Sequence, residues 1–173
     1  MNRPRPEPVQ VVKQRRDTAL AALVGAIPYA KFLGVHFDRR GDELTATLPF
    51  DEKLIGNPFL PALHGGATSA FLEITALIEL SWSMLWEEME SGQIDPGRLG
   101  SDHLPRLPKT IDFTVDYLRS GRPVDTYGRA VITKQGRRVA TVHAEAWQDD
   151  RLRPIAAAHG HFLLKPADEP AGS

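Results

Sequence analysis

The longest regular pattern in the chain is a run of apolar residues at helical spacing between Gly66 and Met89. At about 1.5 Å per residue, a helix over this segment is roughly 36 Å long. Between Lys53 and Glu79 the only carboxylate, lysine or arginine is Glu73, so most of the helix surface is apolar. The pattern predicts one long helix buried at the centre of the protein.

Alternation of apolar and polar residues predicts strands on both sides of this helix. Residues 35–50 are typical of a hairpin that turns at Arg40-Gly41-Asp42. Four further strands are expected at 110–117, 124–133, 137–148 and 154–164. Because consecutive strands are joined by short turns, the pattern favours an antiparallel meander. The predicted class is α+β, with a curved antiparallel sheet wrapped around the long helix.

The strand expected at 110–117 has the clearest alternation. One face would carry Ile111, Phe113, Val115 and Tyr117, and the other Thr110, Asp112, Thr114 and Asp116.

The remaining segments set the predicted domain boundaries. A short helix is expected over 17–27, with Asp17 as its N-cap and a stop before Pro28. Residues 1–10 and 166–173 are polar and rich in proline, and we expect loose ends there. Residues 11–165 then form a single domain, with a long loop over 91–108.

Composition narrows the possible functions. The chain has 21 Lys and Arg against 22 Asp and Glu, so a nucleic acid would meet no attractive net charge. It has no cysteine, which excludes disulfides, thiolate nucleophiles and cysteine metal sites. No stretch approaches the roughly 20 apolar residues of a membrane span, and the first ten residues lack the apolar core of a signal peptide. We expect a cytoplasmic protein that binds neither nucleic acid nor membrane.

Glu73 and the turn before the helix carry the candidate chemistry. A carboxylate among apolar neighbours is desolvated, which raises its pKa toward the range of a general base. Just upstream, the amides of the His64-Gly65-Gly66 turn lie at the positive end of the helix dipole, where they could stabilise an oxyanion. Two alternatives stay open: Glu73 on an exposed stripe of the helix, and Gly65-Gly66 as an ordinary turn.

The run 57–66, NPFLPALHGG, followed by Glu73, resembles the signature of the phenylacetate-pathway (PaaI-type) hotdog thioesterases. In that family an Asn, a His-Gly-Gly turn and an Asp or Glu nine residues after the His form the active site. The similarity extends through Tyr117-Leu118-Arg119, the Gly136-Arg137-Arg138 turn and the strand 156–160, AAAHG. The resemblance implies a hotdog fold and hydrolysis of an acyl-CoA thioester.

The resemblance also implies residue roles. Glu73 would act as general base or as nucleophile, and the Gly65 amide would polarise the thioester carbonyl. Asn57 would orient water or the thioester, Thr110 would help hold the water, and His64 would order the turn. These groups would come from two subunits of a homodimer or homotetramer. The chain departs from the family in having Leu60-Pro61 where many relatives have a glycine.

Binding of the substrate, acyl-CoA, needs further groups. Gly66 would let the chain approach it closely, and Arg119, Arg137 and Arg138 are candidates for the phosphates of coenzyme A, because guanidinium groups bind phosphate bidentately. His159 and His161 share a strand face, but no carboxylate or third histidine is placed with them, so we expect no metal site. Coenzyme A would enter only as part of the substrate, with no separate cofactor.

Two other functions remain open on this fold. One is a non-catalytic module that binds or senses acyl-CoA, because a fold does not fix a function. The other is an enoyl-CoA hydratase or dehydratase, although the histidine and acidic motif of those enzymes is missing here. Glu73, Asn57 and Thr110 together favour thioester hydrolysis.

Overall fold

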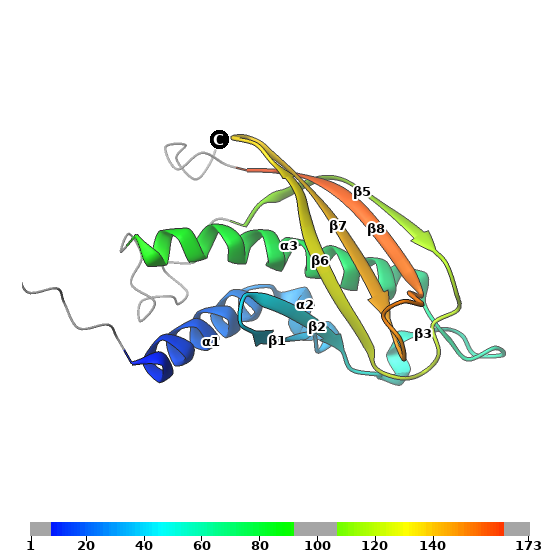
Figure 1. Ribbon diagram of the computed structural model, residues 1–173. Helices are drawn as coiled ribbons and strands as arrows, with labels where there is room; N and C mark the ends of the chain where they lie inside the picture. The colour runs from blue at the N-terminus through cyan, green and yellow to red at the C-terminus, as the bar shows by residue number, and fades with distance from the viewer. Residues whose placement is uncertain (1–7, 92–106, 165–173) are drawn as a thin grey trace, which may run out of the picture.

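The computed structural model describes residues 8–91 and 107–164, and the termini and the segment 92–106 lie outside the described part. Its central element is α3 (Gly65–Glu90), which confirms the predicted long helix. A curved six-stranded antiparallel sheet lies across this helix (Figure 1). The α+β class and the hotdog architecture are therefore confirmed.

The strands follow the predicted ranges closely but pair in a different order. The predicted hairpin is confirmed as β1 (His36–Arg40) and β2 (Glu43–Leu48), with Gly41 at a positive φ of 63° in its turn. The other strands are β5 (Lys109–Tyr117), β6 (Thr126–Gln135), β7 (Val139–Trp147) and β8 (Ala156–Leu163). The sheet order is β1-β2-β6-β7-β8-β5, so β6 to β8 form a meander while β5 pairs with β8 at the edge.

Small residues on the inner face of the sheet allow α3 to lie close to it. The inward positions of β7 and β8 include Ala140, Ala144, Ala146, Ala156 and Ala158, all almost fully buried. On β6, a Cβ at Gly128 would lie 2.9 Å from the Phe71 ring of α3. Large side chains of the helix, such as Phe71 and Ile78, then fill the space left by the small residues of the sheet.

The N-terminal part of the structure differs from the short helix that was predicted. Helix α1 spans Val9–Gly25, and its N-cap is Pro8. Asp17 lies inside this helix, where its carboxylate accepts hydrogen bonds from Arg39 instead of capping an end. A second helix, α2 (Pro28–Leu33), begins where a stop was expected, because proline is well tolerated in the first turn of a helix.

Three short elements between β2 and α3 were not predicted. They are the 3₁₀ turn η1 (Glu52–Leu54) and the strands β3 (Ile55–Asn57) and β4 (Ala62–Leu63). The two strands form a separate hairpin that projects beyond the first turn of α3 (Figure 1). This hairpin carries Asn57 and leads directly into the His64 turn.

Candidate active site

Glu73 and Thr110 meet between α3 and the edge strand β5. The hydroxyl of Thr110 donates a hydrogen bond of 2.8 Å to Oε1 of Glu73. The Glu73 side chain is half-buried, so it lies neither in the core nor on a fully exposed stripe of the helix. A hydrogen bond to a carboxylate is stronger than one between neutral groups, and it holds this oxygen in a defined position.

A break in the alternation of β5 brings Thr110 to this position. Thr110 pairs with Phe162 of β8 and Asp112 pairs with His161, so Ile111 is an extra residue in the strand. The strict alternation expected from sequence is therefore wrong at this point. Ile111 is 55% exposed, and Thr110 lies on the inner side of the sheet with the buried Phe162. Such bulges commonly redirect a side chain beside an active site.

The turn before α3 is organised by His64. The Gly66 amide donates a hydrogen bond of 2.9 Å to Nδ1 of His64, and the His64 amide donates to the carbonyl of Leu54. A Cβ at Gly66 would lie 2.9 Å from Nδ1, so any larger residue there would displace the imidazole from this position. Because Nδ1 accepts from an amide, a neutral imidazole carries its proton on Nε2.

The Gly65 amide is the donor that this turn leaves available. Gly65 is the first residue of α3, so its N–H has no partner within the helix. In the described part of the chain, no hydrogen bond from this amide to another group is found. The Gly65 carbonyl accepts a hydrogen bond of 2.8 Å from the Tyr117 hydroxyl, which ties the turn to the end of β5.

Within one protomer the carboxylate and the free amide lie far apart. Gly65 and Glu73 are eight residues apart on α3, which corresponds to about 12 Å along the helix. One thioester carbonyl cannot contact both groups at this separation. The structure therefore brings together Glu73 with Thr110, and His64 with Gly65 and Gly66, as two candidate half-sites.

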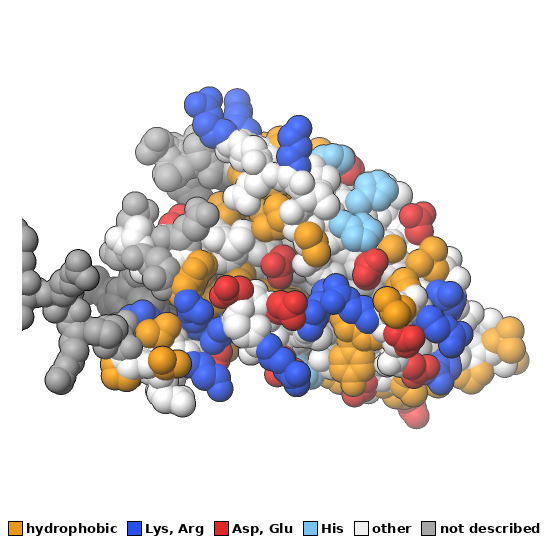
Figure 2. All heavy atoms as spheres, viewed as in Figure 1, with side chains coloured by type: hydrophobic (Ala, Val, Ile, Leu, Met, Phe, Trp, Pro, Cys, Tyr) orange, Lys and Arg blue, Asp and Glu red, His pale blue; other side chains and the backbone are white. Residues whose placement is uncertain are grey.

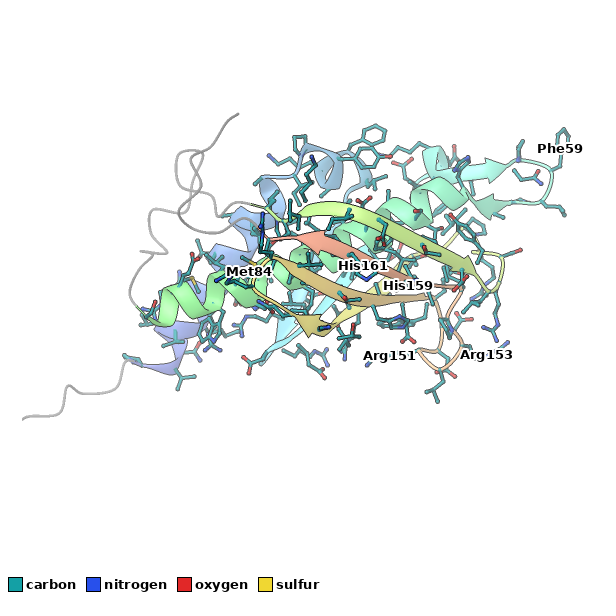
Figure 3. The ribbon with its side chains drawn as sticks, turned by 90° about the horizontal axis from the view of Figure 1, so that it is seen from above. Phe59, Met84, Arg151, Arg153, His159 and His161 are labelled. Atoms are coloured by element: carbon teal, nitrogen blue, oxygen red, sulfur yellow. The ribbon has the colours of Figure 1, made fainter. Side chains whose placement is uncertain are left out.

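Asn57 belongs to neither pair within the protomer. Its Oδ1 accepts hydrogen bonds from the Phe59 and Leu60 amides, at 3.0 and 3.3 Å, and so shapes the loop that contains Leu60-Pro61. Phe59 is 91% exposed and lies at the tip of the projecting hairpin (Figure 3). The side-chain amide of Asn57 keeps its two N–H donors for other partners.

The three arginines proposed for phosphate binding lie at opposite ends of the sheet. Arg119 follows β5, and its Nη1 donates a hydrogen bond of 2.7 Å to the carbonyl of Pro154. Arg137 and Arg138 form the turn between β6 and β7, where the Leu164 amide donates to the Arg138 carbonyl. Arg119 is thus near the Gly65 half-site, and the other pair is at the Thr110 end of the sheet.

Histidines gather on the outer face of the sheet, away from α3 (Figure 2). His159 and His161 of β8 lie there with His143 of β7. Nδ1 of His161 lies 2.9 Å from a carboxylate oxygen of Asp112. The structure thus places a carboxylate and a third histidine on this face, which the sequence did not predict. Residues 8–91 and 107–164 contain no group of three or more His, Asp or Glu side chains that could hold a metal ion.

Glu79 is a second carboxylate of α3 that the sequence did not single out. It lies beside a cavity of about 270 Å³ between β2 and β6, with Arg129 and Arg151 among the lining residues. Burial raises the pKa of Glu79 to about 7, although the nearby positive charge of Arg129 opposes the shift. Its apolar neighbours in the helix were the signal that could have identified it.

Replacing Glu79 with glutamine is expected to stabilise the protein at pH 8 but not near pH 4.5. A raised pKa in the folded state means that stability falls as the pH rises from about 4.5 to about 7 and is then constant. The gain at pH 8 should be on the order of 2 kcal/mol, since partial exposure reduces the full effect. Urea unfolding of both proteins at several pH values measures it, and a difference that does not change with pH would contradict the assignment.

The fold agrees with that of proteins similar to this chain. Residues 60–155, more than half of its length, match the model of the thioesterase superfamily. The chain therefore belongs to the thioesterase superfamily, a class of thioester hydrolases. Among its described residues, no helix is long and apolar enough to span a membrane.

Individual relatives extend this assignment. The chain is 29% identical over 140 residues to the medium/long-chain acyl-CoA thioesterase YigI of Salmonella typhimurium, covering 80% of this chain and 86% of the relative. A crystal structure of a protein from Chromobacterium violaceum is 37% identical, with a TM-score of 0.62, and covers 92% of this chain and 98% of that one. A putative thioesterase from Ralstonia eutropha, related to phenylacetic acid degradation, has a TM-score of 0.61 at 18% identity and shares the fold, covering 85% and 99% of the two chains.

Proposed function

We propose that the protein is a cytoplasmic acyl-CoA thioesterase that acts as a homodimer or homotetramer without any separate cofactor. The observation that carries the proposal is the Glu73 carboxylate, which lies among mainly apolar residues of α3 and which Thr110 holds at the edge of the sheet. The similarity to YigI, named as a medium/long-chain acyl-CoA thioesterase, supports coenzyme A as the thiol and an alkyl chain as the acyl group.

The reaction follows from the two half-sites. In the general-base route, Glu73 takes a proton from water as the water oxygen attacks the thioester carbonyl. In the nucleophilic route, the carboxylate itself attacks, and water then hydrolyses the mixed anhydride. In both, the Gly65 amide donates to the oxyanion, and the C–S bond breaks to release the thiolate, which takes up a proton. The free acid forms at this step in the first route and on hydrolysis of the anhydride in the second.

A dimer formed through β5 would unite the half-sites. As an edge strand, β5 has unpaired backbone groups on one side, and its exposed Ile111 and Tyr117 would be covered by a partner. A two-fold axis pairs identical edge strands antiparallel, so the Thr110 end of one strand meets the Tyr117 end of the other. Glu73 of one protomer would then face the Gly65 turn of its partner.

Subunit mixing tests both the reaction and this arrangement. The Glu73→Ala and Gly65→Pro variants should each be nearly inactive toward a series of alkyl and aryl acyl-CoAs that the wild type hydrolyses. Refolding them together should restore about a quarter of the wild-type activity, because half of the randomly formed dimers contain one intact site of two. No recovery in verified mixed dimers would place each site within one protomer. Saturable binding of every substrate by the wild type without turnover would instead indicate a sensor.

A further inference from the structure

Two surface pockets share a wall at the end of β5. The first, of about 490 Å³, is lined by Gly65 and Thr68 at the first turn of α3 and extends to Arg119. The second, of about 120 Å³, lies beside the turn between β7 and β8. Arg119, Ser120 and Ile155 line both, so the two pockets are adjacent and together extend from the free Gly65 amide to that turn. We refer to the two adjacent pockets as the path.

The chemical character of the path changes along its length. Near α3 its walls combine the apolar side chains of Ala62, Leu63 and Leu118 with polar groups, among them Thr68 and Tyr117. At the far end the walls carry the guanidinium groups of Arg119, Arg122 and Arg153. Walls of mixed polarity that lead to several cations suit a ligand with a long, weakly polar arm and an anionic end.

The arginines at the far end differ in their present partners. Arg119 is bound to the carbonyl of Pro154, and Arg122 forms an ion pair with Asp149. The Arg153 guanidinium makes no ion pair or hydrogen bond with the residues that the structure describes. It projects from the β7–β8 turn, at the same end of the molecule as Phe59 (Figure 3).

Two carboxylates line the same pocket and offset part of the positive charge of these arginines. Asp149 is already paired with Arg122, and Oδ1 of Asp150 accepts a hydrogen bond from the Leu152 amide within the turn. Three arginines face two aspartates, so one positive charge is left over. Arg153 makes no ion pair with the described residues, so its N–H groups are available, and the unused N–H groups of Arg122 add donors beside it.

We propose that this path binds the coenzyme A part of the substrate, with the pantetheine arm in the first pocket and the phosphates at Arg122 and Arg153. This inference rests on the proposed acyl-CoA hydrolysis and adds a nucleotide site that the sequence did not indicate. It places the phosphates beside the β7–β8 turn, and not at the Arg137-Arg138 turn. The Gly65 amide at the start of the path meets the thioester at the other end of the arm.

The kinetic test compares two substrates with the same acyl group, an acyl-CoA and the corresponding acyl-pantetheine, which lacks the phosphates. The Arg122→Ala/Arg153→Ala double variant should show KM raised roughly tenfold for acyl-CoA and unchanged for acyl-pantetheine, with kcat preserved. Arg40→Ala, on the far edge strand β1, is the control for the loss of a surface arginine and should leave KM for acyl-CoA unchanged. An equal KM of wild type and double variant for acyl-CoA would overturn the proposal, as would a rise confined to Arg137→Ala/Arg138→Ala.

A binding measurement separates this inference from the proposed reaction. Adenosine 3′,5′-bisphosphate carries the phosphates without any thioester, so its binding to the full chain by calorimetry does not depend on turnover. Binding by the wild type that weakens roughly tenfold in the double variant supports the site even if no acyl-CoA is hydrolysed. Equal binding by both proteins overturns the site, even if hydrolysis proceeds normally.

Discussion

Replacing Glu73 with glutamine is expected to reduce kcat for thioester hydrolysis by about 10³-fold. Glutamine keeps the size of the side chain and still accepts the hydrogen bond from Thr110, but it can neither take a proton from water nor attack a carbonyl. KM for the acyl-CoA should change little, because the bond to Thr110 keeps the local structure intact. Steady-state kinetics with the best alkyl acyl-CoA substrate provide the measurement.

Glu73→Asp is the matched control for this experiment. It keeps the charge and withdraws the carboxylate by one methylene, so part of the activity should remain. Circular dichroism and thermal unfolding of both variants check that α3 is unaffected. A glutamine variant with the wild-type kcat would remove Glu73 from the mechanism.

Gly65→Pro is expected to lower kcat by about 10²-fold, because it removes a single donor to the oxyanion. Proline is favoured at the first position of a helix, where its missing N–H breaks no bond within the helix. Gly65 occupies this position in α3, so the substitution deletes the proposed catalytic donor with little effect on the helix itself.

Gly65→Ala is the control that distinguishes loss of the backbone N–H from steric crowding by the added side chain. A Cβ at residue 65 lies 3.2 Å from the ring and hydroxyl of Tyr117, so both substitutions press on the same side chain. Only proline lacks the N–H. We therefore expect the alanine variant to be far more active than the proline variant, and equal activity of the two folded proteins would show that the amide takes no part.

The long helix and its carboxylate were predictable from sequence, whereas the hairpin that carries Asn57 and the extra residue beside Thr110 were not. The α3 pattern and the isolated Glu73 are local features, because a helical face needs only the spacing of residues along one segment. The N-cap assigned to Asp17 failed for the opposite reason. Its carboxylate accepts hydrogen bonds from Arg39, which is 22 positions away in the chain. A contact between such distant residues cannot be predicted from the local sequence.

The pairing of strands could not be predicted from local sequence patterns. Period-two alternation identifies a strand and its faces but not its neighbours, so β5 could not be placed beside β8 before the fold was known. The same limit applies to the pockets near Arg119. Arg122 and Arg153 are 31 residues apart and face one pocket only because the sheet brings the end of β5 to the β7–β8 turn.

The extra residue in β5 has a consequence for aligning this family by sequence. Ile111 adds one position between Thr110 and the rest of the strand without changing the face of the sheet that Thr110 occupies. A homologue without this residue would carry the equivalent Ser or Thr one place closer to its Asp112 counterpart, and a gap-free alignment would match it to Ile111. The equivalent hydroxyl is therefore better located across the ladder, opposite the residue that corresponds to Phe162, than by counting along the strand.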